Sequence, residues 1–304
     1  PRNALRAERS AAAGLLFVSL IWGTTFVAVK SALADTGPLL FVGTRFAIAA
    51  LVAAGVFLPR WRPRSGRLPD GSAAGPRASR ARATAILYGI PVGLVLAFSY
   101  AAQTIGLQTT TPARSAFITA LSVVLVPFWA WALYRRPPGV RPAIGLLLTL
   151  PGSWMLTRPD SGFWHSGDWW TLACAVAFGL HIVLVTRLGG KLETVGFLIG
   201  QLATTAGLAL AVSWMVETPR LDLTPRLVGA LLLTAVLATA VTNWLQIRLQ
   251  PRLPASRTAV IFATEPVFAA VFSFLIIGET LGTAGWLGGA LIVAGVIVSE
   301  TEAR

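Results

Sequence analysis

The sequence is poor in charged residues for a chain of 304 residues. Asp, Glu, Lys and Arg together make up 12% of it, against ~25% in soluble domains, whereas apolar residues make up 55%. The apolar residues gather in runs of roughly 20, the length that a helix needs to cross ~30 Å of hydrocarbon. This composition excludes an ordinary soluble domain and predicts an all-α protein that crosses a membrane many times.

Cysteine and histidine are also scarce, with one Cys (Cys174) and two His in the whole chain. A single cysteine excludes an intrachain disulfide and a multi-cysteine metal site. The sequence lacks a G-x-S-x-G elbow, an H-E-x-x-H helix and a Walker phosphate loop. The nearest approach to a phosphate loop, at residues 189–192, lacks the upstream glycine spacing and the Ser or Thr. We therefore expect no enzymatic activity, no ATP consumption, no cofactor and no metal.

Acidic residues are outnumbered by basic ones, which gives a net charge of +13. In a soluble protein this excess would indicate a nucleic-acid partner. Here seven arginines lie in one Pro- and Gly-rich linker at 59–82, without aromatic residues spaced for base stacking. We therefore expect a solvated cytoplasmic loop at this linker, and no nucleic-acid partner.

Ten apolar segments are predicted as membrane-spanning helices, and the charges of the loops orient them. With the N-terminus in the cytoplasm, the cytoplasmic segments carry sixteen Lys and Arg residues, against Arg158 and Arg220 in the opposite loops. Basic residues concentrate on the cytoplasmic side of membrane proteins, so both termini are expected there. The predicted spans are 12–33, 38–58, 84–106, 113–134, 142–157, 169–187, 195–216, 226–248, 255–277 and 283–299.

The second half of the chain repeats the first. Without gaps, an offset of 143 residues aligns identical residues along three helices, among them Gln103 with Gln246 and Arg114 with Arg257. An offset of 156 aligns the earlier helices, because the arginine-rich linker lengthens the first copy. Five helices per copy is an odd number, so the copies must face opposite ways across the membrane.

The repeat predicts two units, 1–158 and 159–304, in inverted orientation around a central cavity. Repeats related by an axis in the membrane plane are typical of secondary transporters, which bind their substrate at the interface between the repeats. Small-residue spacings such as Gly89-x-x-x-Gly93 predict close helix contacts, either within the chain or between copies of it.

Paired side chains at i, i+3 spacing share a helical face and correspond between the two halves. Aromatic rings with a few amides suit a mostly apolar pocket for a zwitterion with an apolar side chain. Plain helix packing is the alternative for each aromatic residue, and a satisfied core histidine is the alternative for His181. The pairs are Trp22/Thr25 with Phe178/His181 near mid-membrane, and Tyr100/Gln103 with Asn243/Gln246 toward the periplasmic and cytoplasmic mouths.

Charged residues inside the predicted spans are the other candidates, since burying them in hydrocarbon is costly. Glu265 lies about ten residues into the ninth span, ~15 Å deep, beside the helix-kinking Pro266. It either binds a substrate amine or a coupling proton in a cavity, or is a structural carboxylate neutralised by its neighbours. Arg45 either binds a carboxylate or reaches to the membrane interface. Arg114 and Arg257, close to the starts of their spans, are expected at the interface.

Several segments resemble the drug/metabolite transporter superfamily and, more narrowly, its EamA-type ten-helix exporters. They are Trp22-Gly23-Thr24-Thr25-Phe26 with Lys30, Gly43-Thr44-Arg45, Glu265-Pro266 and Gly278-Glu279-Thr280-Leu281. The resemblance spans nearly the whole chain, and one departure is Arg135-Arg136, where many members carry Gly-Glu-Arg. It implies movement of amino acids, other metabolites and drugs across bacterial inner membranes, and a relation to the family's aromatic amino acid exporters.

Together these observations predict a secondary transporter that works without ATP, by alternating access and in the export direction. Its expected partners are a lipid bilayer and a small-molecule substrate, most of all an aromatic or large apolar amino acid. Two other classes stay open: a membrane-embedded enzyme, with Glu265 and His181 as the candidate pair, and a receptor or scaffold. The predicted substrate-binding residues are Trp22, Thr25, Arg45, Tyr100, Gln103, Phe178, His181, Asn243, Gln246 and Glu265.

Overall fold

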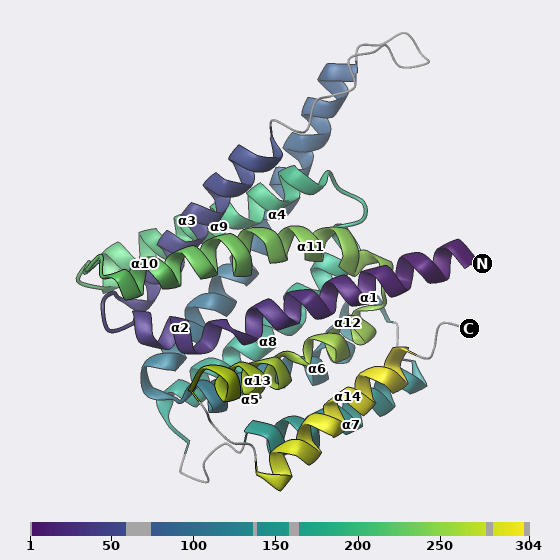
Figure 1. Ribbon diagram of the computed structural model, residues 1–304. Helices are drawn as coiled ribbons and strands as arrows, with labels where there is room; N and C mark the ends of the chain where they lie inside the picture. The colour runs from purple at the N-terminus through teal and green to yellow at the C-terminus, as the bar shows by residue number, and fades with distance from the viewer. Residues whose placement is uncertain (1, 59–73, 136–138, 158–163, 278–281, 301–304) are drawn as a thin grey trace.

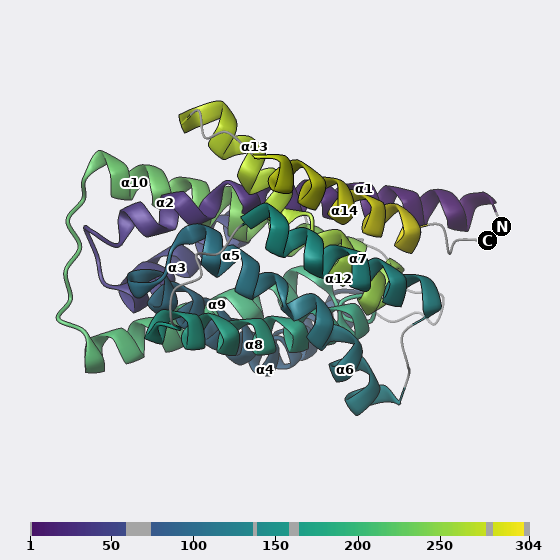
Figure 2. The same ribbon diagram turned by 90° about the horizontal axis from the view of Figure 1, so that it is seen from below.

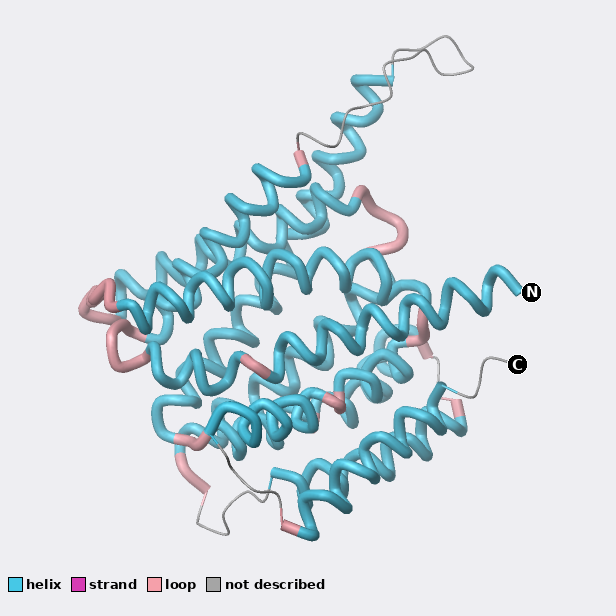
Figure 3. The backbone as a smooth tube through the Cα atoms, viewed as in Figure 1, coloured by secondary structure: helices cyan, strands magenta, loops and turns pink. Residues whose placement is uncertain are grey.

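The computed structural model describes residues 2–58, 74–135, 139–157, 164–277 and 282–300. These residues form helices, and the described part of the chain has no strand beyond one isolated bridge between Thr36 and Leu221 (Figure 3). Eight helical stretches in these ranges are long and apolar enough to cross a membrane. The all-α, multi-pass architecture is thus confirmed, whereas a count of ten spans, which adds α7 (Val140–Thr157) and α14 (Thr283–Glu300), remains a prediction.

Each predicted span coincides with one helix or with a run of consecutive helices. Three of these runs are interrupted by a turn, and a fourth, which is continuous, contains a π-helical stretch. The elements are α1 Arg2–Gly23, α2 Thr25–Ala32, α3 Pro38–Phe57, α4 Ala74–Thr109, α5 Pro112–Ala120, α6 Ser122–Tyr134, α7 Val140–Thr157, α8 Ser166–Leu188, α9 Thr194–Val216, α10 Pro225–Leu232, the π-helix η1 Leu233–Val241, α11 Thr242–Leu249, the short 3₁₀ helix η2 Gln250–Arg252, α12 Ala255–Phe262, α13 Glu265–Ile277 and α14 Thr283–Glu300.

The arginine-rich linker is shorter than predicted, because α4 begins at Ala74 instead of after residue 82. The segment from Ala74 to Arg82 is rich in Ala and Arg, which favour helix, and α4 projects beyond the rest of the bundle (Figure 1). The prediction of a loop over 74–82 is therefore wrong. The remainder of the linker, 59–73, lies outside the described residues.

Both chain ends lie at the same end of the bundle (Figures 1 and 2). We call the opposite end, where α2 ends and α10 begins, the distal end. Between the two ends, buried apolar side chains form three clusters: one among α3, α4, α8 and α9, one among α1, α6, α8 and α12, and one at the distal end among α2, α5 and α10. Large apolar side chains also point outward, Met215 being 83% exposed. Such a surface suits lipid and would be a liability in water.

Helices α7 and α14 lie side by side at one edge of the bundle (Figure 1) and touch through glycines. A Cβ atom added at Gly152 would lie 2.8 Å from the carbonyl oxygen of Gly288, and one added at Gly145 would lie 2.8 Å from that of Gly295. Since the offset of 143 maps Gly145 onto Gly288 and Gly152 onto Gly295, each glycine meets the repeat partner of the other. A two-fold axis between two helices produces this reciprocal contact.

Gly152→Ala is expected to lower the free energy of unfolding by about 1–3 kcal/mol, because the new methyl group meets backbone that has no room to move. Gly207→Ala in α9 is the matched control, since nothing lies within 4 Å of its added Cβ. There the higher helix propensity of Ala should stabilise by about 0.5–1 kcal/mol. Thermal unfolding of both variants in detergent checks this, and equal midpoints would contradict the close contact of α7 with α14.

Candidate functional site

A central cavity lies between helices from both halves of the chain and has about 750 Å³ of empty space, including the part open to solvent. The structure brings all ten predicted substrate-binding residues together on its wall. They come from α1, α2, α3, α4, α8, α11 and α13: Trp22, Thr25, Arg45, Tyr100, Gln103, Phe178, His181, Asn243, Gln246 and Glu265.

Two polar residues on the cavity wall, Thr119 and Ser122, were missed from the sequence. They flank the break between α5 and α6 at Leu121. The repeat gives a signal for Ser122, because the offset of 143 aligns it with Glu265, whereas Thr119 aligns with Phe262. The two halves therefore place a hydroxyl and a carboxylate at corresponding positions of the cavity.

Glu265 begins α13, directly after the break that separates this helix from α12. Pro266 has no N–H group to donate to the carbonyl of Phe262 four residues earlier. The hydroxyl of Ser19 in α1 donates to this carbonyl at 3.3 Å and accepts from Thr264 at 3.0 Å, so the break is held by side chains. Within the described part of the chain, no hydrogen bond or ion pair reaches the Glu265 carboxylate.

Arg45 does not extend to the membrane interface; it is 3% exposed and connects α3 to η1. Its Nε donates to Thr239 Oγ1 at 2.7 Å, and its Nη2 donates to the carbonyl of Ala238 at 3.3 Å. The guanidinium also lies 4.7 Å from the centre of the Tyr100 ring, a distance typical of a cation–π contact. These contacts use two of the five N–H groups of the guanidinium, which also lines the cavity.

The aromatic and histidine candidates line the cavity, as binding residues would, and they also contact other side chains of the protein, as packing residues would. Both alternatives therefore remain for them. Tyr100 makes edge contacts with Phe178 at 5.2 Å and with Phe46 at 4.9 Å between ring centres. The buried His181 has its Nε2 2.9 Å from Gln201 Oε1. An amide oxygen accepts, so Nε2 donates and, in the neutral ring, Nδ1 is left as an acceptor.

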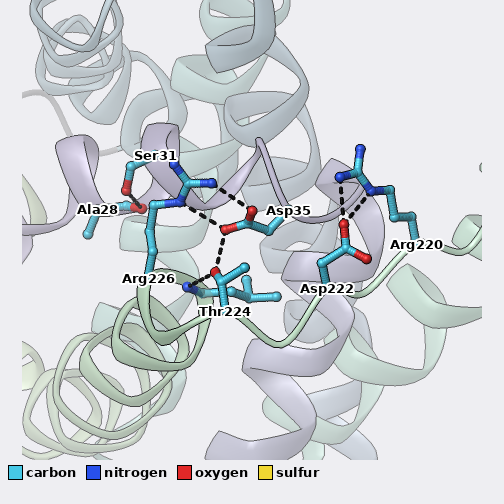
Figure 4. A network of polar contacts seen from close by, with 8 residues as sticks. Ala28, Ser31, Asp35, Arg220, Asp222, Thr224 and Arg226 are labelled. Atoms are coloured by element: carbon cyan, nitrogen blue, oxygen red, sulfur yellow. Dashed lines mark hydrogen bonds and ion pairs between the residues drawn. The ribbon is translucent and has the colours of Figure 1, made fainter.

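Polar contacts join the two halves at the distal end (Figure 4). The carboxylate of Asp35, between α2 and α3, accepts from Arg226 Nε at 2.9 Å, from Arg226 Nη2 at 2.6 Å and from the Thr224 hydroxyl at 2.7 Å. These hydrogen bonds, first that of Arg226 and then that of Thr224, lower the pKa of Asp35 from 3.8 to about 2. The backbone of Asp222 adds a bond to the carbonyl of Asp35 at 3.0 Å.

Two helix termini at the distal end are capped by charged side chains from other helices. Glu217, which follows α9, accepts from the backbone N–H groups of Leu39 and Leu40 at 2.8 and 3.0 Å and so caps the start of α3. The ammonium group of Lys30 in α2 donates to carbonyl groups at the end of α4, including that of Leu107. Lys30, which the sequence offered only as part of a family motif, thus has a structural role.

Two ion pairs of buried arginines correspond between the halves. Arg114 pairs with Asp168 of α8 at 2.9 Å at the distal end, and Arg257 pairs with Glu8 of α1 at 3.0 Å near the chain ends. Each arginine therefore contacts the first helix of the other half. Both arginines lie near helix starts as predicted, but at 6% and 4% exposure they are buried in protein.

Asp35→Asn is expected to destabilise the protein at neutral pH and to have no effect in strong acid. Because the pKa of Asp35 is lower in the folded than in the unfolded state, its ionised form favours folding above about pH 4. This stabilisation is lost as the pH falls from about 4 to about 2. The measurement is the difference in unfolding midpoint between wild type and variant across this range. A difference that does not change with pH would contradict the contact.

Comparison with known proteins agrees with this architecture. The model of the EamA-like transporter family matches residues 9–158 and 165–301. The chain belongs to the EamA-like transporter family. The family resemblance read from the sequence is thus confirmed.

Two of the three relatives of this EamA-like chain described here are named uncharacterized transporters, and none of the three names states a substrate. An uncharacterized transporter of Archaeoglobus fulgidus is 32% identical over 285 residues, covering 94% of this chain and 84% of that protein. The uncharacterized transporter YvbV of Bacillus subtilis is 25% identical over 294 residues, covering 95% and 91%. The chloroplastic WAT1-related protein At3g02690 of Arabidopsis thaliana is 27% identical, covering 90% and 66%. A protein crystal structure with a TM-score of 0.76 covers 97% of both chains and, at 20% identity, shows the fold alone.

Proposed function

We propose that the protein is a secondary transporter that carries small metabolites through the central cavity by alternating access. The observation that carries this proposal is the convergence of ten polar, charged and aromatic side chains from both halves on one cavity. Membership of a transporter family supports it. The ten residues are proposed to bind the substrate, and no enzymatic step is part of this function.

The proposed architecture is two five-helix repeats, 1–158 and 159–304, inserted in opposite orientations as ten spans with both termini in the cytoplasm. Three observations support it. The glycine contacts of α7 with α14 and the ion pairs of Arg114 and Arg257 are reciprocal between the halves. The helix breaks at Leu121 and Thr264 are 143 residues apart. The family model matches one segment in each half.

For the substrate we propose amino acids with aromatic or large apolar side chains, and drug molecules of similar shape. The rings of Trp22, Tyr100 and Phe178 on the cavity wall support an apolar ligand, and Glu265 offers a partner for an amino group. The bacterial inner membrane and the export direction rest on the resemblance to EamA-type exporters.

Purified protein in liposomes without ATP tests this function. We expect protein-dependent initial uptake and counterflow of labelled phenylalanine or tryptophan, relative to liposomes without protein. Flux of a different metabolite alone would contradict the substrate class and keep the transporter. Absence of flux across a broad panel of metabolites and drugs would contradict the function itself.

A further inference from the structure

The π-helix η1 lies where the alignment of the two halves shifts by one residue. The offset of 143 places η1 on residues 90–98, which belong to the uninterrupted α-helix α4. After η1, this offset aligns cavity residues with one another, such as Gln103 with Gln246.

Before η1, the burial of the two spans matches at an offset of 142 instead. This offset aligns the buried Ala85 with the buried Leu227, and the buried Gly89 with the buried Leu231. The offset of 143 would align Gly89 with Leu232, which is 56% exposed. A π-helix closes its hydrogen bonds one residue later than an α-helix and so accommodates an extra residue. The second half therefore has one residue more in this span, and η1 contains it.

The wide turn of η1 redirects one backbone carbonyl. In an α-helix the carbonyl of Ala238 would accept from the N–H of Thr242, four residues later. That N–H donates instead to the carbonyls three and five residues before it. The Ala238 carbonyl accepts from the indole N–H of Trp22 at 3.2 Å and from Arg45 Nη2 at 3.3 Å. Both donors belong to cavity-lining residues of the first half.

Thr239 makes the second contact of η1 with Arg45. Its hydroxyl donates to the Thr234 carbonyl at 2.7 Å, and its oxygen accepts from Arg45 Nε at 2.7 Å. Thr239 is fully buried and is not among the residues that line the cavity. At the corresponding position the first half has Leu96, whose side chain carries no hydroxyl. The Thr239 hydroxyl therefore reaches the cavity through Arg45.

These two contacts determine how the Arg45 guanidinium is oriented. Nε and Nη2 form one edge of the planar group, and η1 binds this edge. Three of the five N–H groups lie outside these two bonds, on Nη1 and Nη2, and the Tyr100 hydroxyl interacts with the same guanidinium. A guanidinium edge can bind a carboxylate through two parallel hydrogen bonds.

We propose that Thr239 is a positioning residue for the substrate. Its hydrogen bond to Nε holds the Nη1–Nη2 edge of Arg45 in place for the carboxylate of a bound amino acid. Without this bond, the long side chain would have to be ordered when the substrate binds, which costs affinity. The inference rests on the proposed function in taking the cavity as the site of an amino acid, and it adds a residue that does not touch the substrate.

The test is titration calorimetry of the purified full chain in detergent with phenylalanine and with phenethylamine, which lacks the carboxylate. Thr239→Val replaces the hydroxyl with a methyl group. It should weaken the binding of phenylalanine about tenfold and that of phenethylamine less than about twofold. Thr239→Ser, which keeps the hydroxyl, should bind phenylalanine as wild type does. A merely structural role predicts equal weakening of both ligands by Thr239→Val.

Thr205→Val is the matched control, because the buried Thr205 hydroxyl donates to the Gly93 carbonyl at 3.0 Å and does not line the cavity. It should leave both affinities unchanged. If Thr239→Val does not fold, Thr239→Ala removes the same hydroxyl without adding atoms and gives the same comparison.

Three results would overturn the inference: wild-type affinity for phenylalanine in Thr239→Val, equal weakening of both ligands, or a Thr239→Ser variant that binds phenylalanine as weakly as Thr239→Val. Wild-type protein that binds neither ligand would contradict both this inference and the proposed substrate class. Binding of phenylalanine without transport of any metabolite would contradict the proposed function alone.

Discussion

Replacing Glu265 with Gln is expected to lower the initial rate of transport roughly ten- to a hundredfold in a protein that stays folded. Gln has a similar volume, so the break between α12 and α13, which Ser19 and Thr264 hold, should persist. The substitution removes a charge-assisted hydrogen bond to the substrate, worth about 1.5–3 kcal/mol, or else a group that carries a proton. Flux and unfolding midpoint should be measured on the same preparation.

Glu193→Gln is the matched control, because Glu193 accepts from the N–H groups of Val195 and Gly196 at the start of α9 and does not line the cavity. It should lower the unfolding midpoint and leave the flux per folded molecule unchanged. A well-folded Glu265→Gln variant that transports at the wild-type rate, from mildly acidic to mildly alkaline pH, would remove Glu265 from the mechanism.

Asp168→Ala is expected to reduce the free energy of unfolding by about 3–5 kcal/mol, the effect of breaking a buried ion pair. Asp168 is fully buried. Its carboxylate contacts Arg114 at 2.9 Å, the Thr110 hydroxyl at 2.7 Å and the backbone N–H of His165 at 2.8 Å. The substitution therefore removes a counter-charge from a buried guanidinium and a connection between the two halves.

Asp222→Ala is the control for Asp168→Ala, since Asp222 pairs with Arg220 while both side chains are at least half exposed. Exposed ion pairs contribute about 0–1 kcal/mol, so its midpoint should stay near that of wild type. Thermal or denaturant unfolding of the two variants in detergent gives the comparison. Equal, small losses would mean that the Arg114–Asp168 contact does not stabilise the fold.

The helices of this protein are predictable from its sequence, because apolar runs as long as a membrane is thick have few other solutions. The repeat was visible as well, and it aligned residues such as Gln103 and Gln246 that line the same cavity. The end of the linker was predicted wrongly, because α4 begins at Ala74, before the expected span. In this segment helix propensity, and not hydropathy, determines that the chain is helical.

The location of eight candidate residues followed from helical spacing and the repeat, and that of Arg45 and Glu265 from charge inside a predicted span, but their contacts did not follow. Arg45 is occupied by the Ala238 carbonyl and Thr239, and both belong to the π-helix η1, whose geometry no spacing rule predicted. The pairing of Asp35 with Arg226 joins residues far apart in sequence, so neither residue alone indicates it. Such partners depend on how helices pack, which periodicity does not specify.

The most direct test of the account is whether one position in the cavity becomes accessible from both sides of the membrane. Thr119 lines the cavity, and Cys174 is the one native cysteine and is buried, so Thr119→Cys in a Cys174→Ser background provides a single reporter. A membrane-impermeant thiol reagent applied to right-side-out and to inverted vesicles should label it from each side, and a bound substrate should slow both reactions. Labelling from one side alone, with and without substrate, would contradict alternating access through this cavity.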